Sequence, residues 1–158
     1  MPVFISHRKA DTLIALTISL SFALEGVKNY IDELDEEIQR TDDITSLIMK
    51  RVNECSHMMV IVSGNTQGSW WVPFEIGVAS RADRRITTYK SEDKITLPEF
   101  LKKWPILKNN IDLKKFIKLY KQDIAVPIME GRTFTKAAYS ISEAGVFHSE
   151  LKRLIGQR

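Results

Sequence analysis

The chain has 158 residues, of which 44% are hydrophobic and 27% charged, with a net charge of +3 at pH 7. This length and mixture are typical of one soluble globular domain and exclude a disordered chain. The single cysteine, Cys55, excludes a disulfide framework and a cysteine-based zinc site. We expect a buried structural thiol, no metal site and a cytoplasmic location.

The chain opens with a predicted strand over residues 2–6 and a predicted helix over residues 9–25, with Gly26 at its C-cap. Residues 12–24 are nearly all apolar but too few to span a membrane, which needs about 20 residues. A signal peptide is the alternative, because Arg8 and Lys9 precede the run. Asp11 opens the run, however, and a strand comes first. We therefore predict a core helix buried on most sides, and no membrane contact.

The rest of the chain alternates short apolar runs with helical patterns, which predicts a parallel α/β sheet. A helix capped by Asp42 or Asp43 is expected before the apolar strand Met58–Val62. Further strands are predicted over residues 28–32, 86–89 and 105–107, and further helices over residues 71–82, 97–103 and 111–120.

The end of the chain is predicted to be helical. We expect Ile111, Phe116, Ile117 and Tyr120 to face inward. Ser140 and Glu143 form a capping-box pattern before a last helix with Val146, Leu151, Leu154 and Ile155 on its inner face. We predict a domain over residues 1–121 and a helical extension over 122–158 packed on it. Four lysines at helical spacing indicate a solvated face, not a nucleic-acid site: Lys114, Lys115, Lys118 and Lys121.

Polar residues follow the strands of this sheet. In doubly wound sheets, ligands bind beyond the carboxyl ends of the strands, where the strand order reverses. Trp71 and Glu75 are four apart and share a helix face, and a ring beside a carboxylate suits a ligand with a flat ring and a ribose. The strand-end residues are Ser6, His7, Arg8, Asp32 and Ser63.

Ordinary structural explanations exist for each of these residues. Glu75 as a solvated helix residue, His7 as a structural hydrogen bonder, and Arg8 with Asp32 as an exposed ion pair are all compatible with the pattern. The chain has no zinc-ligand spacing, no phosphate-binding glycine loop and no nucleophile elbow. The spacing alone predicts an α/β domain with a polar crevice.

The segment Val3–Arg8 resembles the opening strand motif of TIR domains. Tyr30–Asp32 and Met59–Ser63 resemble their second and third strands, and Ser69–Trp71 followed by Glu75 resembles the tryptophan-x-x-x-glutamate element of TIR enzymes. The resemblance spans residues 2–120 and implies a flavodoxin-like fold, with five parallel strands in the order 2-1-3-4-5. It also implies cleavage of NAD in catalytic members of the family.

The same resemblance assigns roles to residues. Glu75 matches the catalytic glutamate, Trp71 the tryptophan one turn earlier, and Arg8 and Asp32 positions on the active-site rim. His7 takes a place often held by tyrosine. The acidic loop after Asp32 is where these domains commonly contact one another.

The chemistry agrees with this assignment. The nicotinamide of NAD is already a cationic leaving group, so its cleavage needs negative charge beside a developing oxocarbenium ion and no general acid. We expect NAD as substrate and no cofactor, with a linear or cyclic ADP-ribose as product. The chain looks like the stand-alone TIR sensors of bacterial Thoeris antiphage systems. That likeness implies TIR–TIR self-association and a separate nucleotide-sensing effector.

Two other functions fit the sequence. A non-catalytic TIR adaptor would act by domain–domain contact, and has no need of a carboxylate at position 75. An enzyme like the nucleoside deoxyribosyltransferases shares the sheet and a glutamate nucleophile, and would act on deoxynucleosides.

Overall fold

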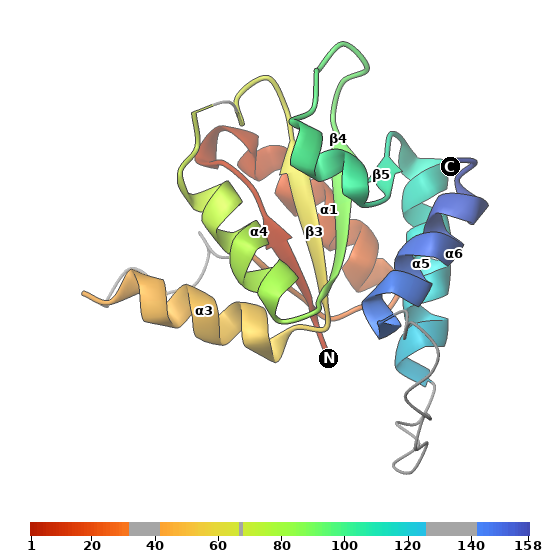
Figure 1. The fold of residues 1–158 in the computed structure, drawn as a ribbon, viewed down its shortest axis with the longest axis horizontal. Coiled ribbons are helices and arrows are strands. Elements are labelled where there is room, and N and C mark those ends of the chain that lie inside the picture. The colour runs from red at the N-terminus through yellow and green to blue at the C-terminus, as the bar shows by residue number, and fades with distance from the viewer. Residues whose placement is uncertain (32–41, 67, 126–141) are drawn as a thin grey trace, which may run out of the picture.

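A computed structural model of the protein describes residues 1–31, 42–66, 68–125 and 142–158. Its strands form one parallel sheet in the order β2-β1-β3-β4-β5, which confirms the predicted flavodoxin-like topology. The carboxyl ends of the strands lie at the edge opposite the N-terminus (Figure 1). The strands are β1 (Val3–Ser6), β2 (Asn29–Ile31), β3 (His57–Val62), β4 (Arg85–Lys90) and β5 (Ile106–Leu107).

Helices cover both faces of the sheet (Figure 1). One hydrophobic core joins the sheet to α1 (Thr12–Leu24), α5 (Asn110–Ala125) and α6 (Glu143–Leu154). The other core joins it to α3 (Ile44–Glu54), α4 (Trp71–Arg81) and the short 3-10 helix η3 (Glu99–Lys103). Strand β3 is buried along its whole length, as its apolar, β-branched sequence predicts.

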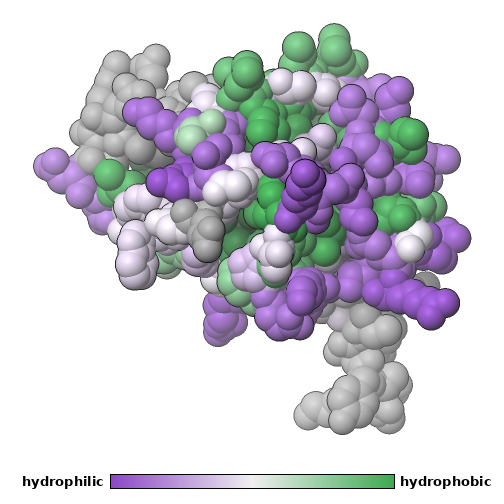
Figure 2. Space-filling model, turned by 90° about the horizontal axis from the view of Figure 1, so that it is seen from above, coloured by the Kyte–Doolittle hydropathy of each residue, from purple (hydrophilic) through white to green (hydrophobic). Residues whose placement is uncertain are grey.

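Helix α1 is not buried on most sides, so that prediction was wrong. It follows a 3-10 turn, η1 (Lys9–Asp11), and buries only a narrow stripe against the sheet, formed by Ala15, Ile18 and Phe22. The opposite face is exposed, because the sheet covers one side of the helix only. Leucines exposed by 42–80% stand there at helical spacing: Leu13, Leu16, Leu20 and Leu24. Seen from above (Figure 2), hydrophobic residues reach the surface in several patches among hydrophilic ones.

Two residues predicted to face inward are exposed, because each lies on another side of its helix than the one that packs against the core. In α5, Phe116, Ile117 and Tyr120 are buried as predicted, but Ile111 is 67% exposed and Leu113 takes the inner place. In α6, Leu151 is buried and Leu154 and Ile155 pack partly against the core. Val146 is exposed, because its neighbour Phe147 continues the inner stripe.

The helix caps follow local chemistry. Asp43, rather than Asp42, caps α3 by accepting a hydrogen bond from the Ser46 N–H at 3.0 Å. Ser142 caps α6 by accepting from the Gly145 N–H at 3.1 Å, while the predicted cap, Ser140, lies outside the described residues.

The chain end returns to the sheet. The side chain of Gln157 pairs with the backbone of Ile106 in β5, with its amide oxygen 3.0 Å from the Ile106 nitrogen and its amide nitrogen 2.5 Å from the carbonyl oxygen. Residue 121, the predicted domain boundary, falls inside α5, which continues to Ala125. The division into a domain and an extension stays a prediction.

Candidate active site

Glu75 is a buried carboxylate on the inner face of α4. It shares that face with Val72, Ile76 and Ala79, which pack toward the core, and it is fully buried with them. Pro73 lies in the first turn, where a helix has no need of its N–H. A helix register set by apolar packing therefore carries a charged group into the protein, which excludes the explanation of Glu75 as a solvated helix residue.

The partner of Glu75 comes from a distant part of the sequence. The hydroxyl of Ser6, the last residue of β1, donates a hydrogen bond to Glu75 Oε2. Ser6 is itself fully buried. Strands β1 and β3 are neighbours in the sheet and α4 follows β3, so this bond lies at the carboxyl edge where the strand order reverses.

Trp71 lies one turn before Glu75 and reaches the surface. Its ring is 46% exposed and stands edge-on to Phe74, with 5.9 Å between the ring centroids. Trp70, by contrast, is 90% exposed. The helix thus presents an accessible aromatic surface at its start and a buried carboxylate one turn later.

The loop after β1 brings two more predicted residues to the same edge. His7 is buried, with Nε2 3.2 Å from Thr12 Oγ1. Arg8 is exposed, and its guanidinium donates to the backbone carbonyl of Asn65 in the loop after β3. Asp32, predicted to complete this rim, lies outside the described residues.

Ser63 reveals a carboxylate that sequence reasoning missed. Its hydroxyl donates to the carboxylate of Asp11, with oxygen–oxygen distances of 2.7 and 2.6 Å, and the side-chain amide of Asn65 donates to Asp11 Oδ1 at 3.0 Å. Asp11 is buried. The sequence does place the acidic Asp11 between a predicted strand and an apolar helix. A carboxylate buried there needs hydrogen-bond donors from other segments.

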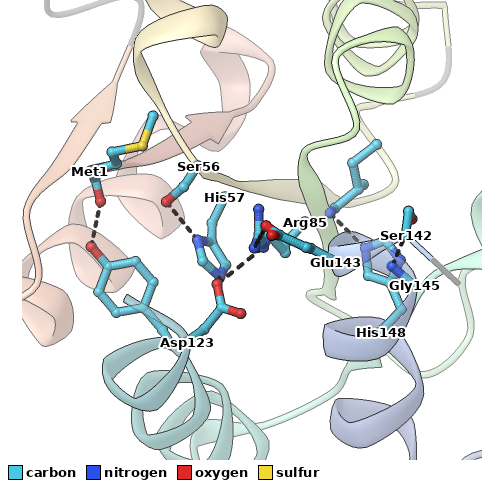
Figure 3. Close-up of polar contacts among 11 residues, drawn as sticks. Met1, Ser56, His57, Arg85, Asp123, Ser142, Glu143, Gly145 and His148 are labelled. Atoms are coloured by element: carbon cyan, nitrogen blue, oxygen red, sulfur yellow. Dashed lines mark hydrogen bonds and ion pairs between the residues drawn. The ribbon is translucent and has the colours of Figure 1, made fainter. Parts of the chain in front are cut away.

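A second polar cluster lies at the opposite edge, where β3 and β4 begin (Figure 3). Ser56 Oγ is 2.8 Å from His57 Nδ1, and His57 Nε2 is 3.4 Å from Asp123 Oδ2. Arg85 Nε lies 3.0 Å from the same Asp123 oxygen. Burial, reinforced by Arg85, lowers the pKa of His57 to about 2. The imidazole is therefore uncharged near neutral pH, and Ser56 and His57 are both buried, as expected of groups with a structural role.

This second cluster holds the C-terminal helices against the sheet. Arg85 in β4 pairs with Asp123 in α5 and, at 3.0 Å, with Glu143 in α6. His148 in α6 accepts a hydrogen bond from the Ile86 N–H at 2.9 Å, and burial lowers the pKa of His148 to about 4. Cys55 is also buried, and burial raises the pKa of its thiol to about 12, as expected of a structural residue.

Other candidate sites carry less chemistry. A cavity of about 230 Å³ lies between α1, β4 and α5, and uncharged residues such as Ile18, Tyr89 and Leu113 line it. Within the residues that the structure describes, histidine, cysteine and acidic side chains nowhere gather in a group of three that could hold a metal. The helices described are all too short or too polar to cross a bilayer.

Comparison with known proteins agrees with this architecture. The family model of the TIR domain matches residues 3–125, a span that runs from β1 through α5 and includes Ser6, Arg8, Ser63, Trp71 and Glu75. A search of curated proteins finds no match. Because the match covers most of the chain and the sheet has the order 2-1-3-4-5, the chain belongs to the TIR domain family.

Proposed function

We propose that this TIR domain cleaves the nicotinamide–ribose bond of NAD, with Glu75 as its catalytic carboxylate. The observation that carries the proposal is the position of Glu75, fully buried and bonded to Ser6 at the carboxyl edge of the sheet. The family includes both NAD-cleaving enzymes and non-catalytic adaptors. A carboxylate kept from water interacts strongly with developing charge, which benefits a reaction and is of no use to a contact surface.

The reaction needs little beyond this charge. The bond between ribose C1′ and the nicotinamide nitrogen breaks, and its electron pair neutralises the cationic ring as it leaves. The sugar carbon becomes positive, and Glu75 stabilises it while accepting a hydrogen bond from a ribose hydroxyl. Water then adds to C1′ and loses a proton, which gives ADP-ribose. Attack by a hydroxyl or ring nitrogen of the same molecule gives a cyclic product instead.

The remaining residues would bind the substrate. Arg8 is an exposed cation at the carboxyl edge of the sheet and suits the diphosphate of NAD. The accessible ring of Trp71 can pack against a base and exclude water from the reacting carbon. His7, Ser63 and Asp32 complete the proposed rim. Ser6 holds the Glu75 carboxylate in place as well as lining the site.

We further propose that the product is a signal in bacterial antiphage defence, made in the cytoplasm and read by a separate nucleotide-sensing effector. The support for this part of the proposal is the TIR match over residues 3–125, together with the likeness of the strand and tryptophan–glutamate motifs to Thoeris-type TIR sensors. Self-association of TIR domains would accompany the activity.

A second function, contact with another TIR domain, is favoured by one observation. The outer face of α1 exposes Leu13, Leu16, Leu20 and Leu24, and no charged residue stands between positions 12 and 24. Such a surface suits a protein partner. It is compatible with an enzyme that assembles and with an adaptor that only assembles.

Product analysis separates these functions. Purified protein at several concentrations would be incubated with NAD, and separately with deoxynucleosides, and the products identified by mass spectrometry. We expect nicotinamide and an ADP-ribose from NAD, and a loss of at least about 100-fold in Glu75→Gln. Glu99→Gln, a change of the same kind at an exposed glutamate, is the matched control and should retain activity.

Two results would reject the enzymatic proposal. Unchanged nicotinamide release in Glu75→Gln would remove Glu75 from the reaction. No release by wild type at any concentration, with concentration-dependent association intact, would support the adaptor instead.

A further inference from the structure

Two serine–carboxylate hydrogen bonds connect the segment that follows β1 with the segment that follows β3. Ser6 at the end of β1 donates to Glu75, which follows β3. Ser63, just after β3, donates to Asp11, which follows β1. Each strand end is therefore bonded to the segment that continues its neighbour. The proposed reaction uses Glu75 and leaves Asp11 without a role.

The buried carboxylate of Asp11 binds two residues of the loop after β3. Its carboxylate accepts from the Ser63 hydroxyl and from the Asn65 side-chain amide, and Ser63 Oγ in turn accepts from the Asn65 backbone N–H at 2.9 Å. Asp11 is 2% exposed, whereas Asn65 is exposed. A buried anion thus fixes both the side chain and the backbone of a residue that faces the solvent.

Asn65 is also the residue that Arg8 contacts. The Arg8 guanidinium donates to the Asn65 carbonyl, so Asn65 is held by Arg8 on one side and by Asp11 and Ser63 on the other. Arg8 and Asp11 are three residues apart in the same loop. The hydrogen bonds described thus run from Asp11 through Asn65 to Arg8.

Stability alone does not explain a carboxylate in this position. Burying a charge among neutral donors is unfavourable for folding, and an uncharged pair would fill the space at lower cost. A carboxylate, however, offers two acceptor oxygens and a negative charge to the hydroxyl and amide donors, whereas a neutral amide would offer one oxygen and one NH2 donor. Uncompensated buried charge is a mark of functional sites.

We propose that Asp11 is a positioning residue for substrate binding, which holds Asn65 and, through it, Arg8 in the orientation that receives the diphosphate of the substrate. This inference rests on the proposed function. Asp11 touches neither Glu75 nor Ser6 in the hydrogen bonds described, so it acts on binding and not on the bond-breaking step.

The consequence is a separation of kinetic constants. Asp11→Asn keeps the shape of the side chain but places a donor where an acceptor is needed, so Asn65 and Arg8 shift. We expect KM for NAD to rise at least about tenfold, with kcat within about threefold of wild type, because small displacements of a binding group are costly. Glu75→Gln lowers kcat instead.

The test is a double-mutant cycle on steady-state nicotinamide release. If Asp11 acts through Arg8, the double variant Asp11→Asn/Arg8→Ala has the KM of Arg8→Ala alone. A matched pair probes the other end of the bond: Ser63→Ala should raise KM as Asp11→Asn does, and Ser63→Thr, which keeps the hydroxyl, should restore it. Circular dichroism and thermal melting confirm that each variant is folded.

The outcomes distinguish the two proposals. Wild type that releases no nicotinamide contradicts the proposed function and this inference together. Active wild type combined with an unchanged KM in Asp11→Asn, a loss confined to kcat, or KM effects that multiply in the double variant overturns the inference alone. If Asp11→Asn does not fold, the Ser63 pair decides, and equal KM values in Ser63→Ala and Ser63→Thr overturn it.

Discussion

The two edges of the sheet bury polar groups in opposite ways. At the carboxyl edge, Glu75 and Asp11 are bonded to neutral serine hydroxyls, so their negative charge is not neutralised by those partners. At the amino edge, Arg85 lies against the carboxylate of Asp123, and the imidazole of His57 stays uncharged. The first arrangement leaves an electric field for a ligand to use. The second cancels its charges and serves to join helices to strands.

Lowering the pH should reduce the stability that the amino edge contributes to the fold. Burial holds the pKa of His148 at about 4, below the value of about 6.5 expected in an unfolded chain. Between these pH values the unfolded chain binds a proton that the folded chain does not. Stability is therefore greatest above pH 6.5, and His148 alone should lower it by about 3 kcal/mol as the pH drops to 4. His57, whose pKa burial lowers to about 2, adds a loss of the same sign.

Urea unfolding at pH 7, 5.5 and 4.5 measures this loss. Nearby Asp83 acts against the shift of His148, whereas Lys103, Lys152 and Arg85 add to it; the raised pKa of Asp123 opposes the loss at low pH. His148→Gln is the control, because its side-chain oxygen can still accept from Ile86 but does not titrate. Equal pH slopes in wild type and His148→Gln would contradict the prediction.

Removing the cation of the amino edge should weaken the fold without changing the chemistry. Arg85→Ala leaves Asp123 partly buried and without its cationic partner, which should lower the free energy of unfolding by about 2 kcal/mol. The folded variant should keep wild-type kcat and KM for nicotinamide release. A change in either constant in fully folded Arg85→Ala would show that the two edges are coupled.

Removing the serine hydroxyl at the carboxyl edge should, in contrast, change the chemistry. Ser6→Ala removes the donor that holds Glu75, and we expect kcat for nicotinamide release to fall about tenfold, equivalent to about 1.4 kcal/mol in the barrier. Removing a donor from a buried carboxylate should also lower the free energy of unfolding, by about 1–3 kcal/mol, so kcat is compared in folded protein. The Ser6→Thr variant keeps a hydroxyl and should recover part of the rate. Full activity in Ser6→Ala would remove Ser6 from the site.

The smallest expected effect on stability is on the surface of α1. Leu20→Lys replaces a leucine that is 60% exposed, so unfolding should change by under about 0.5 kcal/mol. Concentration-dependent association, followed by analytical ultracentrifugation, should weaken. Thr17→Lys, one turn earlier on the same exposed side, tests whether charge alone has this effect. Unaltered association in Leu20→Lys would exclude the leucine face as a contact.

The main parts of the fold and the positions of Trp71 and Glu75, the proposed site residues, could be predicted from the sequence. Alternating strands and helices predicted the sheet, and the four-residue spacing of Trp71 and Glu75 placed both at the start of one helix. The burial of Glu75 was not visible, since helical phase depends on Val72 and Ile76 meeting the sheet. Asp11 was missed because its donors, Ser63 and Asn65, are more than 50 residues away.

The hydrophobic pattern gave a wrong prediction where apolar residues do not mark one face of the helix. In Thr12–Leu24 nearly every position is apolar, so the sequence could not indicate which face meets the sheet, and burial on most sides was the wrong conclusion. In α6, Val146 and Phe147 are adjacent, and the contacts of Phe147 with His57 in β3 and Phe116 in α5 make it the inner residue.

The amide of Gln157 has a consequence for how copies of this domain can meet. A side chain here imitates a peptide group: it occupies the outward N–H and C=O of Ile106, as a sixth strand would. Strand β5 is only two residues long, and the outward N–H and C=O groups of its edge residue Ile106 are already paired. Growth of the sheet from one molecule into the next is blocked at β5, so a contact between copies on this side of the domain must form through helices and loops.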